Sequence, residues 1–135
     1  MEERVTPELT APESSPREVP SPQKGTRVKL VNSHTEFMRL IQQNSIAMVK
    51  FHAKWCGPCK SVAPEVDKMS LENPDVTFLS VDVDLNTETA DECDIDMLPT
   101  FLFYIGGKRV EQIIGSASQV IREKLSSIKR IATGF

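Results

Sequence analysis

The sequence predicts an α/β fold, in which helices cover both faces of a mixed central sheet to form a three-layer α/β/α sandwich. From residue 26 to residue 93, strand-like and helix-like patterns alternate, which favours parallel strands joined by right-handed crossovers. Residues 46–53 are apolar almost throughout, as in a central strand that is covered on both faces. Gly106 and Gly107 then predict a hairpin that adds antiparallel edge strands.

The chain divides into a tail and one domain. Five of the nine prolines lie in residues 1–25, among Glu, Ser and Thr and few large apolar side chains. Such a segment cannot bury enough surface to offset its ordering entropy. We therefore expect a disordered arm, which is either a solvated tail or a docking or regulatory segment. Residues 26–135 are expected to form the folded domain.

Composition argues against several classes of protein. The net charge of −3, with 26 % charged residues, lacks the positive excess of a nucleic-acid-binding surface. No apolar stretch approaches the roughly 18 residues that span a bilayer. The first ten residues carry three glutamates and lack the apolar core of a signal peptide. We expect a cytoplasmic protein that binds neither nucleic acid nor membrane.

Local patterns predict the elements around the central strand. Polar and apolar residues alternate over residues 27–31, as in an edge strand. Ser33 and Glu36 form a capping box that begins a helix. The buried face of this helix would carry Phe37, Leu40 and Ile41. A second helix follows the central strand, and Pro64 inside it should kink it because proline removes a backbone hydrogen bond.

The remaining elements complete the alternation. Residues 76–81 predict a second central strand, and residues 86–93 a short polar helix. Residues 100–105 and 109–114 are the two strands of the hairpin. Residues 116–119 are expected to cap a final helix. Its inward side chains would be Val120, Ile121, Leu125 and Ile128.

Two of the three cysteines indicate redox chemistry. Cys56 and Cys59 lie three positions apart, and such positions on one helical turn are roughly 5–6 Å apart, close enough for a disulfide. A strand that leads into a helix through paired thiols is typical of redox proteins. A structural zinc site needs four ligands, and no second C-x-x-C or close Cys/His pair is present. We expect no metal and no bound cofactor.

The residues around the pair resemble the thioredoxin family. The six residues 55–60 read Trp-Cys-Gly-Pro-Cys-Lys, which is the family's active-site hexapeptide without a change. The other shared features are Pro64 in the following helix, Pro99-Thr100 as a cis-proline step, Gly106-Gly107 as the hairpin turn, and Gly115. The resemblance covers residues 26–131 and implies the thioredoxin fold.

The resemblance implies a protein disulfide reductase that serves general cell redox homeostasis. Cys56 would be the nucleophile, because a helix N-terminus favours its thiolate, and Cys59 would resolve the mixed disulfide. Gly57 and Pro58 would leave Cys56 exposed and set Cys59 deeper. Trp55 would offer an apolar face to the substrate.

A cis Pro99 would expose the Leu98 backbone to an extended substrate segment. The resemblance further implies client proteins that contain disulfides, such as peroxiredoxins, ribonucleotide reductase and methionine sulfoxide reductase. A thioredoxin reductase or a low-molecular-weight dithiol would be the reductant, and we expect a monomer. The alternative is a thioredoxin-like interaction scaffold whose binding is switched by redox state.

Three residues depart from the family pattern or stand apart from it. Lys50 occupies the position of a commonly buried aspartate, six residues before Cys56. Its ammonium either reaches water or stabilises the Cys59 thiolate. His52, on the same strand face, is either a substitute proton acceptor or merely packed. Cys93 is either a site of regulatory oxidation or of an intermolecular disulfide, or it is an inert thiol.

Overall fold

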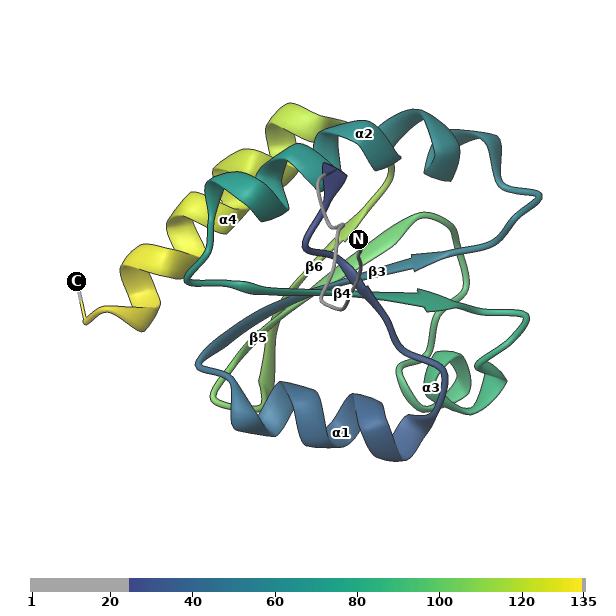
Figure 1. The fold of residues 1–135 in the computed structure, drawn as a ribbon, viewed down its shortest axis with the longest axis horizontal. Coiled ribbons are helices and arrows are strands. Elements are labelled where there is room, and N and C mark those ends of the chain that lie inside the picture. The colour runs from purple at the N-terminus through teal and green to yellow at the C-terminus, as the bar shows by residue number, and fades with distance from the viewer. Residues whose placement is uncertain (1–24, 135) are drawn as a thin grey trace, which may run out of the picture.

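The computed structural model describes residues 25–134, so the predicted arm lies outside the described residues except for Gly25. A single mixed sheet has the strand order β2-β4-β3-β5-β6, and helices lie on both of its sides (Figure 1). The predicted three-layer α/β/α architecture is confirmed. In chain order the elements are β2 (Lys29–Leu30), α1 (His34–Gln43), β3 (Ile46–His52), α2 (Gly57–Glu72), β4 (Thr77–Asp82), α3 (Thr87–Glu92), β5 (Thr100–Ile105), β6 (Lys108–Ile114) and α4 (Ser118–Ala132).

β3 lies at the centre of the sheet. It pairs in parallel with β4, where His52 is opposite Asp82, and antiparallel with β5. The predicted parallel pairing of the early strands is therefore confirmed. The prediction that both hairpin strands lie at the edge is wrong for β5, which is enclosed between β3 and β6. Five of its six residues are buried, because its side chains pack in the apolar clusters on both faces of the sheet.

The first strand is shorter than predicted, because only Lys29 and Leu30 pair with β4. Before residue 29 the backbone amides find side-chain partners instead. The N–H of Arg27 donates to Oγ of Ser70, and the N–H of Val28 donates to Oγ1 of Thr26, each at 2.9 Å. The strand therefore begins only where β4 carbonyls come within reach.

Two apolar clusters fill the spaces above and below the sheet, and β3 contributes to both. Ile46 and Met48 pack with α2 and α4, whereas Val49 and Phe51 pack on the opposite face, where Figure 1 shows α1 and α3. Successive strand residues point to opposite faces. Lys50 and His52 alternate with Val49 and Phe51, as Ile46 and Met48 do, so their side chains point to the sheet face that α2 covers.

Helix starts and faces were predicted with mixed success. Oγ of Ser33 accepts a hydrogen bond from the N–H of Glu36 at 3.1 Å, so the N-cap of α1 is confirmed. The predicted side-chain cap of α4 is wrong, since its N-cap is Ala117 and has no side-chain bond. Val120 was wrongly placed in the core, because it is 49 % exposed. The other three predicted core residues of α4 are buried: Ile121, Leu125 and Ile128.

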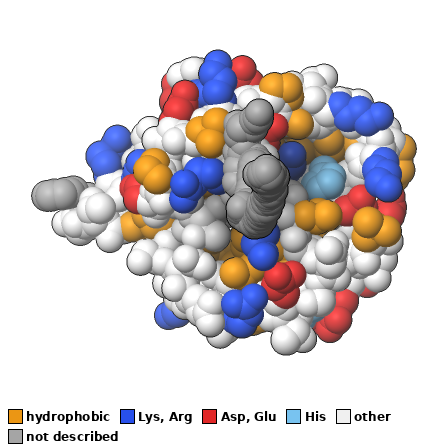
Figure 2. All heavy atoms as spheres, in the orientation of Figure 1, with side chains coloured by type: hydrophobic (Ala, Val, Ile, Leu, Met, Phe, Trp, Pro, Cys, Tyr) orange, Lys and Arg blue, Asp and Glu red, His pale blue; other side chains and the backbone are white. Residues whose placement is uncertain are grey.

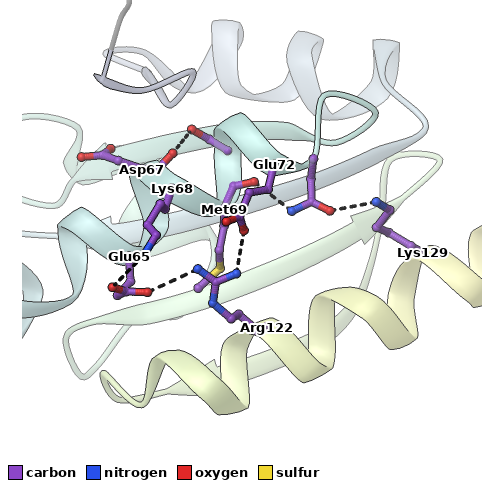
Figure 3. A network of polar contacts seen from close by, with 9 residues as sticks. Glu65, Asp67, Lys68, Met69, Glu72, Arg122 and Lys129 are labelled. Carbon is purple, nitrogen blue, oxygen red and sulfur yellow. Dashed lines mark hydrogen bonds and ion pairs between the residues drawn. The ribbon is translucent and has the colours of Figure 1, made fainter.

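Polar contacts fasten α4 to α2, the helix that begins at the cysteines (Figure 3). Arg122 donates to Glu72 at 2.7 Å and to Glu65 at 3.3 Å. Further along, Nζ of Lys129 donates to Oδ1 of Asn73 at 2.8 Å. These bonds join the second half of α2, from Glu65 to its C-cap Asn73, to α4.

Candidate active site

The chain passes from the end of β3 into α2 within four residues, and Cys56 is the N-cap of that helix. Its Sγ accepts a hydrogen bond from the N–H of Cys59 at 3.2 Å. The two cysteines form a disulfide, with their Cα atoms 5.3 Å apart. In the reduced protein the same amide and the positive end of the helix dipole would stabilise a negative charge on Cys56.

Both cysteines are buried, which corrects the prediction that Cys56 is exposed. Cys56 is 5 % exposed and Cys59 4 %. They pack with Ala53, and Val83 and Leu98 lie against this cluster from segments far along the chain. The two residues differ instead in the cavity that each one lines.

Cys56 lines a surface groove of about 590 Å³. One wall comes from the hexapeptide through Trp55, Gly57 and Pro58. The other wall comes from the chain between β4 and β5: Val83, Ile95, Asp96, Met97 and Leu98. The groove is a mainly apolar surface that passes directly over the nucleophile candidate, as the binding of an extended polypeptide requires.

Trp55 lines the groove and is itself largely exposed. Its ring is 70 % exposed, and its Nε1 donates to Oδ2 of Asp84 at 2.9 Å. This bond gives the indole a defined orientation although little packs on it. The contact joins residues 29 positions apart, so no local sequence pattern could have revealed it.

The Leu98–Pro99 peptide bond is cis, as the resemblance implied. Leu98 is half-buried and belongs to the groove, while Pro99 is buried and is absent from its lining. The carbonyl of Pro99 accepts a hydrogen bond from the N–H of Gly115 at 2.9 Å. Trp55, Gly57, Pro58 and Leu98 thus line the groove together with Cys56, whereas Pro99 does not.

Cys59 lines a second cavity, of about 240 Å³, which we call the rear cavity. Lys50 and His52 reach it from β3, and Lys54 and Lys60 also line it. Lys50 is only 8 % exposed. Burial lowers the pKa of its ammonium, and the nearby Asp67 carboxylate opposes that effect.

His52 carries an unsatisfied nitrogen beside the same cavity. Its Nε2 is buried and has no hydrogen-bond partner among residues 25–134. Burial lowers the pKa of the imidazole, Lys50 lowers it further, and Asp82 raises it in part. Since the ordinary histidine pKa is about 6.5, the ring is neutral at pH 7 and can accept a proton.

Cys93 is the C-cap of α3 and lines neither the groove nor the rear cavity. It is 7 % exposed, and its Sγ lies 3.7 Å from the hydroxyl of Tyr104. Burial raises the pKa of its thiol, which keeps the sulfur in its less reactive protonated form.

Of the groove wall between residues 83 and 98, sequence reasoning predicted only Leu98 and missed the other residues. Asp84, which accepts the hydrogen bond of Trp55, was not predicted as a site residue, and neither were Asp96 and Met97 of the groove lining. Within residues 25–134, no group of three His, Cys, Asp or Glu side chains could hold a metal ion. No helix in that range is long and apolar enough to cross a membrane.

Known proteins resemble this chain in sequence and in structure. The family model for thioredoxin matches residues 28–127. Thioredoxin-1 of Schizosaccharomyces pombe is 39 % identical over 89 residues, which are 66 % of this chain and 86 % of that protein. The mitochondrial Thioredoxin-3 of Saccharomyces cerevisiae is 34 % identical over 103 residues, or 76 % of this chain and 81 % of that protein.

A similar chain also occurs in a solved structure on the thiol-resolving mechanism of a yeast mitochondrial 1-Cys peroxiredoxin via glutathione and thioredoxin systems. It matches with a TM-score of 0.72 and 33 % identity, over 74 % of this chain and 94 % of that chain.

Proposed function

The chain belongs to the thioredoxin family and is a thiol–disulfide oxidoreductase, in which we propose that Cys56 is the nucleophile and Cys59 the resolving thiol. One observation carries this assignment of roles. Cys56 caps α2 and lines the groove, where a client disulfide can reach it, whereas Cys59 lines the rear cavity.

The first step takes place in the groove. The Cys56 thiolate attacks one sulfur of a client disulfide, and the client S–S bond breaks as the Cys56–client disulfide forms. The second client sulfur leaves as a thiolate and takes up a proton. The backbone N–H of Cys59 donates a hydrogen bond to Sγ of Cys56 in this step, as it does at 3.2 Å in the oxidised protein.

The second step releases the client. The Cys59 thiol loses its proton, and its sulfur attacks Sγ of Cys56. The client leaves as a thiolate that is then protonated, and the Cys56–Cys59 disulfide of the present structure forms. Two electrons have passed from the dithiol to the client.

We propose that the groove binds the client as an extended segment. Trp55, Gly57 and Pro58 would contact it on one side, and the Leu98 backbone would pair with it on the other. Pro99, the next residue, is buried and does not line the groove. The mainly apolar lining of the groove and the position of Cys56 in it favour this assignment.

For the proton of Cys59 we propose His52 as the acceptor. It shares the rear cavity with Cys59, its Nε2 has no other partner among the described residues, and it is neutral at pH 7. Lys50 would act differently, because its positive charge in that cavity favours the Cys59 thiolate.

Thioredoxins act on protein disulfides, and we propose peroxiredoxins among the clients of this chain, since a related chain occurs in the peroxiredoxin study. We also propose ribonucleotide reductase and methionine sulfoxide reductase as clients. A thioredoxin reductase or a low-molecular-weight dithiol would serve as the reductant, and the protein would act as a monomer. We propose a cytoplasmic location from the composition of the N-terminal segment, whereas the relatives include a mitochondrial protein.

Substrate trapping tests the two cysteine roles. With insulin as the substrate, the wild-type protein should turn over, and Cys59→Ser should stop at a stable disulfide between Cys56 and an insulin chain. Cys56→Ser, the matched control, should neither turn over nor trap. Trapping by Cys56→Ser instead would reverse the two roles. Partner binding that persists with both cysteines replaced, without any turnover, would favour the scaffold alternative.

A further inference from the structure

Acidic side chains are concentrated in the segment that forms the outer wall of the groove. Residues 82–98 contain seven of the chain's nineteen Asp and Glu residues and none of its sixteen Lys and Arg residues. This segment runs from the end of β4 through α3 to the start of β5. The chain as a whole has a net charge of only −3, so this concentration is local.

Two carboxylates of the segment lie at the groove itself. Asp96 lines it, and it is the one charged residue among the described residues that do so. Its side chain is exposed, and no ion pair joins it to a cation within residues 25–134. Asp84 holds the indole of Trp55 at the rim. The groove therefore presents uncompensated negative charge beside Cys56.

The cations near the disulfide lie on its other side. Lys50, Lys54 and Lys60 line the rear cavity with Cys59. In Figure 2, blue side chains lie at the upper right of the molecule and red ones below them, toward the position of α3 in Figure 1. A client segment in the groove therefore meets carboxylates, whereas the lysines line the rear cavity with Cys59, the thiol that the client segment does not contact.

We propose that this groove selects client disulfides flanked by Lys or Arg, and that Asp96 is the residue that determines this selectivity. The inference rests on the proposed binding of clients in the groove, and it adds the charge of the client segment. Complementary charge raises the rate of encounter and suppresses partners of the same sign. The apolar walls hold the segment, and Asp96 discriminates among the side chains next to the client cysteine.

Three disulfide peptides that differ only in the residues flanking one cysteine, Lys, Gln or Glu, provide the test. For each variant, kcat/KM on the Lys and Glu peptides is divided by the value on the Gln peptide, so that a general loss of activity cancels. At low salt the wild-type protein should prefer the Lys peptide to the Glu peptide by roughly five- to tenfold. The preference should shrink at high ionic strength.

Asp96→Lys should abolish or invert that preference. Glu123→Lys is the matched control, because it makes the same change of charge on an exposed residue of α4 and should keep the wild-type ratio. Equal turnover of the three peptides by the wild-type protein, or an unchanged ratio in Asp96→Lys, would overturn the inference. If the wild-type protein reduced no peptide, not even the Gln peptide, the assignment of the groove to client binding would fail and the inference with it.

Discussion

Lys50 places a positive charge near Cys59, one of the two thiols that form the disulfide. It is almost fully buried and lines the rear cavity with Cys59. A nearby cation stabilises a thiolate and therefore favours the reduced form over the disulfide. Family members with a buried aspartate at this position lack this cation, so we expect this chain to be the stronger oxidant.

Lys50→Asp should accordingly lower the reduction potential. We expect a change of roughly 30 mV, which corresponds to about 1.4 kcal/mol for a two-electron couple. Equilibration with glutathione buffers measures it, with the single tryptophan, Trp55 beside the disulfide, as the fluorescent reporter. Lys54→Asp is the control, because Lys54 lines the same cavity but is exposed, and it should shift the potential less. An unchanged or raised potential in Lys50→Asp would refute the argument.

His52 predicts a pH dependence for release of the client. Burial and Lys50 lower its pKa, and Asp82 raises it by less. The ring therefore becomes charged only below the ordinary histidine pKa of about 6.5. As the pH falls through that lowered pKa, the imidazole loses its capacity to accept a proton and resolution of the mixed disulfide should slow. At pH 7 the acceptor is intact.

His52→Gln should resolve the mixed disulfide more slowly at pH 7, by roughly tenfold or more, and should lose the acidic decline of the rate. Stopped-flow mixing of a preformed mixed disulfide measures both. The chain's other histidine supplies the control, since His34 contacts Thr89 of α3 and lines neither cavity of the cysteines, so His34→Gln should keep the wild-type profile. Identical profiles for His52→Gln and the wild-type protein would exclude His52 as the acceptor.

α4 shows how one position along a helix separates core from surface. Ile121 is fully buried, whereas Val120 is 49 % exposed. Neighbouring helix positions differ by about 100° around the axis, so the face that contains Ile121, Leu125 and Ile128 excludes Val120. The sequence pattern identified three of these four residues correctly and extended the apolar face by one position too many.

Ile121→Ala should reduce the free energy of unfolding by about 2–5 kcal/mol, because it leaves a cavity between α4 and the sheet. Val120→Ala, which removes apolar surface from a half-exposed side chain, should change it by about 0.5 kcal/mol or less. Urea denaturation of the two variants measures the difference. Similar losses in both would mean that Val120 also packs against the core.

Hydrophobic periodicity and turn residues were sufficient to predict the order and type of the elements. The apolar run of β3, the N-cap at Ser33 and the glycine pair of the hairpin are each local signals. The enclosed position of β5 was missed because strand pairing is settled by all five strands together. The burial of Cys56 was missed because Val83 and Leu98 cover it from segments remote in sequence.

The same distinction applies to the active site. Both cysteines and Trp55 could be identified from six consecutive residues. The opposite wall of the groove could not, because Asp84 and Asp96 acquire their positions only when the segment between β4 and β5 folds back beside α2. Local patterns thus identified the reacting atoms, and the tertiary structure was needed to find what surrounds them.

Cys56 and Cys59 share one bond, yet they line cavities with different walls. Substitutions in residues 83–98 can change which proteins are reduced, and substitutions around Lys50 can change the reduction potential of the disulfide. The two properties can diverge separately in evolution, and an engineer could redirect this protein to a new target without altering its oxidising power.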